Sequence, residues 1–230
     1  MSLIKAKPIV RALLRPVFIL IACGIAACVA LAHDTERLQR LIAQRFGSEA
    51  SARYNDWREV IQQAASAAEA DKLPRVNEFF NRRVRFVDDQ QIWGRADYWA
   101  SPLEFLGHGA GDCEDFSIAK YFSLIEAGVE RGKLRLIYVR AVIGLPGSGV
   151  PVAHMVLGYY ATPVAEPLVL DNLVTEIRPA SRRPDLTPVF SFNGEGVWTA
   201  TGVDRPGMSV ERLARWTELV QRMRGEGFEP

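Results

Sequence analysis

Apolar side chains recur every three or four residues through the first half of the chain, which is the spacing of one face of an α-helix. In Asp34–Phe46 these positions are Leu38, Leu41, Ile42 and Phe46. The same spacing predicts further helices, which are Glu49–Lys72, a segment through Phe79 and Phe80 that Pro74 opens, one that begins at about Cys113, and Val210–Met223. The N-terminal half is therefore expected to be helical.

The second half of the chain changes to residues that favour β-strands. The predicted strands are Leu134–Ile143, Val152–Tyr160 and Pro167–Asn172, with a loop at Gly144–Gly149 and a shorter extended piece earlier, at Arg82–Phe86. Asn193-Gly194-Glu195-Gly196 separates Phe190–Phe192 from Val197–Thr199, which predicts a β-hairpin. Helices followed by strands of this kind predict an α+β fold with an antiparallel sheet.

The beginning of the chain has the pattern of an export signal. A basic segment without acidic residues precedes an apolar run, Pro16–Ala32, and its basic residues are Lys5, Lys7, Arg11 and Arg15. Ala30-Leu31-Ala32 offers small residues for cleavage before His33. We therefore expect residues 1–32 to be a signal peptide and residues 33–230 to form one domain in the periplasm.

Two alternatives to cleavage remain open at this point. The apolar run has about 17 residues, which is near the lower length limit for a membrane span, so it is also a candidate inner-membrane anchor. Ile25-Ala26-Ala27-Cys28 resembles a lipoprotein signal, which would attach a lipid to Cys28. In either case the membrane is reached only through this segment.

Without the leader, the domain is weakly acidic. The leader carries four of the 28 basic residues and none of the 27 acidic ones, so the remaining chain has a net charge of −3. Nucleic-acid binding depends on basic surfaces that neutralise phosphates. The charge balance therefore argues against a nucleic-acid partner.

Cys113 is the only cysteine outside the leader, because Cys23 and Cys28 lie within it. A lone thiol is often a buried apolar residue with no chemical role. Here it lies at the start of a predicted helix, where free N–H groups and the helix dipole favour a thiolate. The same N–H groups can stabilise the oxyanion that forms when a thiolate attacks a carbonyl. Cys113 is therefore a candidate nucleophile.

Three acidic residues surround this thiol in Gly111-Asp112-Cys113-Glu114-Asp115. Left unpaired, their negative charge would raise the pKa of the thiol. Carboxylates are also favourable at a helix N-terminus, where they cap free N–H groups. A more specific interpretation is a calcium site, because Ca²⁺ takes carboxylate ligands and would offset their charge.

A thiolate nucleophile needs a base, and the chain has three histidines. His33 lies at the leader boundary, and His108 lies in a glycine-rich stretch where an exposed loop position is expected. His154 lies in a predicted strand, and the next strand ends in Asp171-Asn172. A strand histidine is often structural and Asp-Asn often marks a turn. Adjacent strands can also aim an imidazole and its orienting carboxylate at the thiol.

These segments together resemble the family of bacterial transglutaminase-like cysteine proteinases. The resemblance rests on Gly111–Phe122, Ala153–Val156 and Leu170–Asn172, and Tyr98–Glu104 also looks like the family. It extends from about Asp34 to Trp198. The resemblance implies a papain-related, transglutaminase-like α+β domain. It also implies Cys113 as nucleophile, His154 as general base, Asp171 as its orienting residue, and calcium held by Asp112, Glu114 and Asp115.

The resemblance further implies a biological role. Members of this kind are calcium-dependent periplasmic endopeptidases that cut a large cell-surface adhesin near its N-terminus, at a pair of alanines, and so control biofilm dispersal. The periplasmic domain of an inner-membrane cyclic di-GMP receptor sequesters them. Alternatives remain open, which are a protein-crosslinking acyltransferase or a cell-wall peptidase of the same fold, a non-catalytic binding protein, and a membrane-tethered scaffold.

Overall fold

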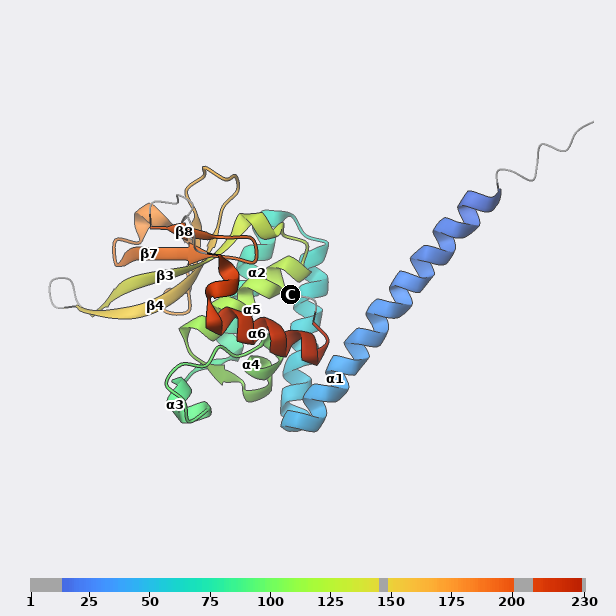
Figure 1. Ribbon diagram of the computed structural model, residues 1–230, viewed down its shortest axis with the longest axis horizontal. Coiled ribbons are helices and arrows are strands. Elements are labelled where there is room, and N and C mark those ends of the chain that lie inside the picture. Colours follow the sequence, from blue (N-terminus) through green and yellow to red (C-terminus); the bar gives the residue numbers. More distant parts are fainter. Residues whose placement is uncertain (1–13, 145–148, 201–208, 229–230) are drawn as a thin grey trace, which may run out of the picture.

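The computed structural model describes residues 14–144, 149–200 and 209–228 of the chain, and for residues 14–34 it describes the backbone alone (Figure 1). The first residues of the expected leader and most of the predicted Gly144–Gly149 loop therefore lie outside the described residues. Over the part searched, no helix combines the length and the apolar character that a membrane span requires.

The first helical segment contains one sharp break. Helix α1 (Leu14–Ala65) loses helical geometry at Gly47, where φ is 84°. Glycine adopts a positive φ without the steric cost that other residues meet. The break separates the two helices that the apolar spacing predicts to end at Phe46 and to begin at Glu49. In Figure 1 the N-terminal part of α1 projects away from the rest of the molecule, whereas Leu38 and Ile42, closer to the break, are buried in the core.

Two predicted helix boundaries are wrong. The helix expected to run to Lys72 ends at Ala65, and Pro74 lies inside helix α2 (Glu69–Arg83) instead of opening a helix. Two features favour the earlier start of α2. Acidic Glu69 and Asp71 occupy its first turn, where they complement the helix dipole. Its apolar face also buries residues on both sides of the proline, and tertiary packing outweighs the local preference.

The strands form one six-stranded antiparallel sheet, so the expected α+β fold is confirmed. The order is β6-β5-β4-β3-β7-β8. The strands are β3 (Leu134–Ile143), β4 (Val150–Tyr159), β5 (Leu168–Leu170), β6 (Arg178–Pro179), β7 (Leu186–Phe192) and β8 (Val197–Thr199). The predicted hairpin is present as β7–β8, and β5 is shorter than expected.

A second, very short ladder joins two distant segments. Strands β1 (Arg85–Phe86) and β2 (Ala110–Gly111) pair in parallel, and the backbone N–H of Val87 donates to the carbonyl of Gly111 at 2.9 Å. Between them lie helices α3 (Asp89–Ile92) and α4 (Pro102–His108). The ladder therefore fixes the residues that immediately precede Cys113.

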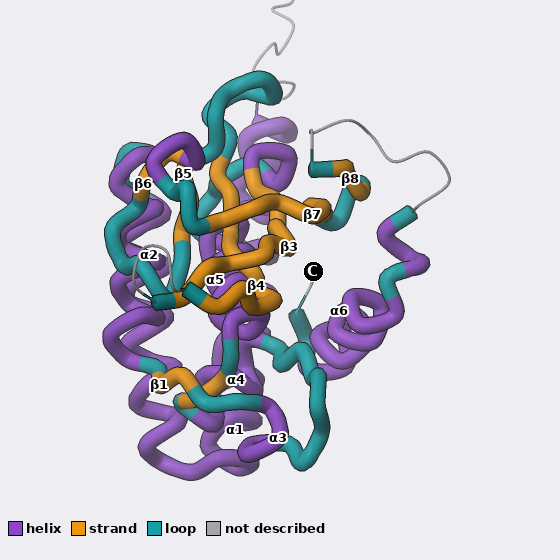
Figure 2. Tube along the Cα trace, turned by 90° about the vertical axis from the view of Figure 1, so that its left-hand side faces the viewer, coloured by secondary structure: helices purple, strands orange, loops and turns teal. Residues whose placement is uncertain are grey.

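Helix α5 (Cys113–Glu126) lies at the centre of the molecule (Figure 2). It contacts β3 and β4 of the sheet, and it also contacts α1, α2 and α4. Every residue from Asp115 to Leu124 is buried. The last helix, α6 (Ala214–Glu226), follows a 3₁₀ turn at Val210–Arg212, so the helix predicted from Val210 begins four residues later. Other 3₁₀ turns span Arg131–Lys133 and Ala180–Arg182.

Candidate active site

Cys113 is the first residue of α5, as the sequence predicts. The chain reaches this point through Gly109, whose φ of 61° caps α4, and then through Gly111. A Cβ on Gly111 would lie 2.4 Å from Oδ2 of Asp115 and 2.6 Å from the Phe105 ring, so only glycine fits there. The positive φ of Gly109 and the close packing at Gly111 thus determine the path of the chain into the N-terminus of α5.

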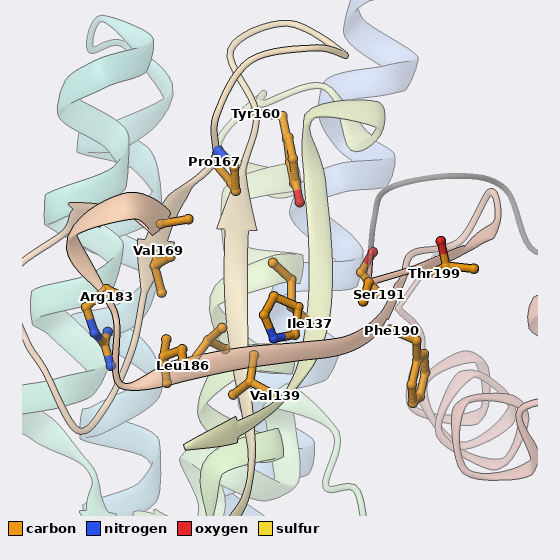
Figure 3. Close-up of a pocket in the computed structure, with 14 residues that line it drawn as sticks. Ile137, Val139, Tyr160, Pro167, Val169, Arg183, Leu186, Phe190, Ser191 and Thr199 are labelled. Carbon is orange, nitrogen blue, oxygen red and sulfur yellow. The ribbon is translucent and has the colours of Figure 1, made fainter. Parts of the chain in front are cut away.

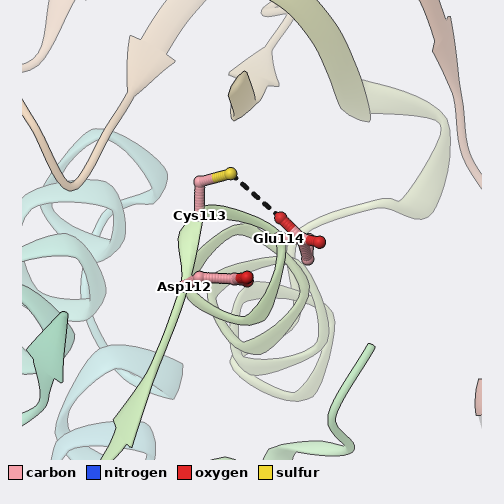
Figure 4. Close-up of side chains that lie close together, drawn as sticks. All are labelled: Asp112, Cys113 and Glu114. Atoms are coloured by element: carbon pink, nitrogen blue, oxygen red, sulfur yellow. Dashed lines mark hydrogen bonds between the residues drawn. The ribbon is translucent and has the colours of Figure 1, made fainter. Parts of the chain in front are cut away.

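The thiol of Cys113 is surrounded by acid. Its Sγ lies 2.9 Å from Oε2 of Glu114, and Figure 4 shows Asp112 beside the same pair. Burial raises the pKa of the Cys113 thiol, the Glu114 carboxylate raises it further, and the backbone N–H of Met155 opposes both. Without a cation, these effects outweigh the helix dipole that favours thiolate.

His154 and Asp171 form a buried hydrogen-bonded pair. Nε2 of His154 lies 2.8 Å from Oδ1 of Asp171, and the two residues are 4% and 1% exposed. An ionised carboxylate only accepts hydrogen bonds, so the ring proton is on Nε2 and Nδ1 is left as an acceptor. The prediction that adjacent strands bring these two side chains together is confirmed.

Arg183 completes the surroundings of Asp171. Its Nη2 donates to Oδ2 of Asp171 at 2.7 Å, while the Leu173 N–H donates to Oδ1 at 3.0 Å. Burial alone would raise the pKa of Asp171. Hydrogen bonds from His154, Leu173 and Arg183 outweigh burial and lower that pKa to about 2. Asp171 is therefore held as a carboxylate.

Helix α5 is fastened to β4 at the residue after His154. The hydroxyl of Ser117, one turn after Cys113, donates to the Met155 carbonyl at 3.0 Å, and the backbone of Met155 lowers the pKa of the Cys113 thiol. The first turn of α5 therefore lies beside β4 at the residue after His154. The structure brings Cys113 to this strand and His154 to Asp171, and a hydrogen bond between Cys113 and His154 stays a prediction.

The other two histidines are not part of this arrangement. His108 ends α4 and packs against the rings of Phe46 and Trp93, with centroids 5.1 Å and 4.6 Å away. It is exposed, as expected, although it belongs to a helix and not to a loop. The side chain of His33 lies outside the described residues.

Acidic side chains from two segments gather beside the thiol. Oxygen atoms of Asp89, Asp112 and Asp115 lie within 4.8 Å of one another, and so do those of Asp89, Asp97 and Glu114. The three residues that the sequence indicates for calcium therefore lie together. Asp89 and Asp97 join them from the segment between β1 and α4.

Electrostatic repulsion marks this acidic cluster, which comprises Asp89, Asp97, Asp112, Glu114 and Asp115. Burial is the main cause that raises the pKa of Asp89 to about 6 and that of Asp112 to about 10, and the neighbouring carboxylates add to both. Burial likewise raises the pKa of Asp115 well above its ordinary value. Within each group of three, the carboxylates are close enough to share one cation.

Three of these site residues escape sequence reasoning. Asp89 and Asp97 lie in a stretch rich in turn formers and aromatic residues, whose acidic content was the available signal. Arg183 lies in a loop and matches no motif that the sequence offers.

Arg183 also lines an apolar cavity of about 320 Å³ between strands of the sheet (Figure 3). Val139 and Val156 line this cavity and belong to a second, smaller apolar cluster, on the face of the sheet opposite to the main core.

The fold and these residues agree with one protein family. Residues 45–185 match the bacterial transglutaminase-like cysteine proteinases. Because the match covers more than half of the chain, the protein belongs to this family of cysteine proteases.

Solved structures of LapG from Legionella pneumophila are similar to this chain. A calcium-bound LapG is 40% identical, with a TM-score of 0.70, and the match covers 82% of this chain and 98% of that one. An EGTA-treated LapG is 39% identical, with a TM-score of 0.69, over 82% and 97% of the two chains. No curated protein matches.

Proposed function

We propose that this protein is a cysteine endopeptidase in which Cys113 is the nucleophile, His154 the general base and Asp171 the residue that orients it. The observation that carries the proposal is the 2.8 Å pair of His154 and Asp171, which lies next to Met155, the residue whose carbonyl accepts from Ser117 of the helix that begins at Cys113. Membership of a cysteine-protease family supports the same assignment.

In the proposed reaction these groups act in sequence. Nδ1 of His154 accepts the thiol proton, and the sulfur of Cys113 then bonds to the carbonyl carbon of a substrate peptide. The backbone N–H of Cys113, at the free end of α5, donates to the oxyanion. His154 returns its proton to the leaving amine, and water next hydrolyses the thioester. Asp171 holds the imidazole in the required tautomer throughout.

Calcium fits the acidic cluster. Asp89, Asp97 and Asp112 each have one buried carboxylate oxygen without a hydrogen-bond partner among the described residues. Such oxygens are the ligands that Ca²⁺ prefers, and LapG has a calcium-bound structure. We therefore propose that Asp112, Glu114 and Asp115 hold calcium together with Asp89 and Asp97. Bound calcium supplies positive charge that offsets the carboxylates around the Cys113 thiol.

The wider role is proposed from the family resemblance. The substrate is a large surface adhesin, cut near its N-terminus to control biofilm dispersal, and the regulator is the periplasmic domain of an inner-membrane cyclic di-GMP receptor. The leader supports a periplasmic location. These partners and this location follow from the resemblance and from the leader, and the geometry of the site is compatible with them.

The proposal is tested by incubating the protein with N-terminal fragments of large surface adhesins, with calcium or with EGTA. Cleavage is expected for the wild type with calcium, a strong loss with EGTA, and none for Cys113→Ala at equal helix content by circular dichroism. Undiminished cleavage by Cys113→Ala would refute the nucleophile. An added primary amine that becomes joined to the substrate, in place of hydrolysis, would favour an acyltransferase.

A further inference from the structure

The outer half of β4 has a free edge. Strand β4 runs from Val150 to Tyr159, but β5 pairs only with Leu157, Gly158 and Tyr159. Within the described parts of the chain, no strand pairs with the preceding residues of β4 on that side. In Figure 1 the β3–β4 hairpin extends beyond the rest of the sheet. Unpaired strand edges of this kind can accept a further strand.

The contacts of Met155 show which backbone groups point out from this edge. Its carbonyl accepts from Ser117 of α5, so it faces away from β3, and the N–H of the same strand residue points to the same side. Backbone groups of alternate residues along a strand face the same side. The N–H and carbonyl of Ala153 and the carbonyl of Pro151 therefore point out from the same edge.

This outward direction agrees with a hydrogen bond at the end of β4, where the backbone of an even-numbered residue faces β3 instead. The N–H of Tyr160, whose position has the opposite parity to that of Met155, donates to the carbonyl of Lys133 next to β3. Ala153 and Pro151 are both exposed residues.

We propose that an extended peptide substrate binds to this edge as an added strand, hydrogen-bonded to the N–H and carbonyl of Ala153. This inference rests on the proposed function, because it places the peptide beside Cys113 and His154. Main-chain pairing at an edge gives affinity without sequence specificity. The substrate class is therefore an unfolded, extended segment of a protein.

An apolar groove adjoins the same edge. Pro151, Val152 and Ala153 line a cavity of about 360 Å³ together with residues of β3 and β7, which are Tyr138, Val139, Arg140, Val189 and Phe190, so Arg140 is its one charged lining residue. Successive side chains of a strand alternate between its two faces. Every second side chain of the added strand would thus meet this groove, where an apolar residue loses less solvation than a charged one.

The test measures alkylation of Cys113 in the intact protein by mass spectrometry, with calcium present. The peptide probe is acetyl-tetra-alanine chloromethyl ketone, and iodoacetamide is the probe without a peptide. Ala153→Pro removes the outward N–H and no β3 hydrogen bond. Ala153→Val changes the side chain and keeps the N–H. The peptide probe should react about fivefold or more slowly with Ala153→Pro than with Ala153→Val, while iodoacetamide reacts equally with both.

A second measurement uses the unaltered protein. Probes with a single N-methyl group at successive amides should show slowed reaction at amides two residues apart, because only alternate N–H groups face Ala153 and Pro151. Equal peptide-probe rates in the two variants, or slowing without this alternation, would overturn the edge proposal. Failure of iodoacetamide to label Cys113 at all would instead remove the proposed nucleophile.

Discussion

At the residue scale, Asp171 has its two carboxylate oxygens committed to different partners, His154 and Arg183. Asp171→Asn removes the charge that holds the imidazole tautomer. We expect kcat for peptide cleavage to fall by about 10³-fold or more, with the fold retained by circular dichroism. Asp185→Asn is the matched control, because Asp185 is the other carboxylate on Arg183 and lies closer to solvent. Equal losses in the two variants would contradict the orienting role.

The same carboxylate predicts a pH dependence of stability. The pKa of Asp171 is lowered to about 2 from an ordinary value of 3.8, so its contribution is fully present above about pH 4. It is lost as the pH falls towards 2, where the folded state also becomes protonated. This amounts to about 2 kcal/mol of unfolding free energy. Urea unfolding between pH 4 and pH 2 should show this decrease in the wild type and a smaller one in Asp171→Asn.

The sequence singled out individual candidate residues where a motif placed them. Cys113, His154 and Asp171 stood out because a helix start, a strand and a strand end each carried one reactive type. Arg183 had no such signal, since its role depends on a loop returning to the buried end of β5. Sequence spacing does not report contacts that only the folded chain creates.

At the element scale, the acidic cluster joins α5 to the α3 region. Asp89→Asn removes one carboxylate whose Oδ1 is buried and unpartnered within the described structure. We expect calcium affinity, measured by isothermal titration calorimetry, to fall about tenfold or more. Asp88→Asn makes the same charge change at the adjacent, exposed position and is the control. Similar affinity losses for both would indicate long-range charge effects instead of ligation.

Element boundaries were predicted well where local signals dominate. Strand β3 and the start of α5 fall where the residue pattern places them, because β-forming residues and a helix start mark them directly. The helices around Pro74 were misplaced because burial of Leu73, Val76, Phe79 and Phe80 overrides the proline. The pairing of β1 with β2 had no sequence signal, since two residues are too few for a pattern.

At the scale of the whole molecule, Trp216 of α6 connects the two halves of the fold. Its ring stacks on Phe122 of α5 at 5.7 Å and meets Phe192 of β7 edge-on at 5.4 Å. We expect Trp216→Ala to lower the free energy of unfolding in urea by about 3–5 kcal/mol. Trp198→Ala, in the edge strand β8, is the comparison and should cost about 1 kcal/mol through its lost contact with Arg135. A cost of only about 1 kcal/mol for Trp216→Ala would mean that α6 contributes little to the core.

The β1–β2 ladder has a consequence for proteolytic clipping. The segment between β1 and β2 contains Asp89 and Asp97. Its two ends are joined by hydrogen bonds that the backbone N–H groups of Arg85 and Val87 donate. Arg95 is exposed at the tip, so trypsin has a target there. One cut after Arg95 would place the two aspartates on separate fragments, which the ladder and a shared cation would still hold together. Chelation should then loosen a nicked molecule far more than an intact one.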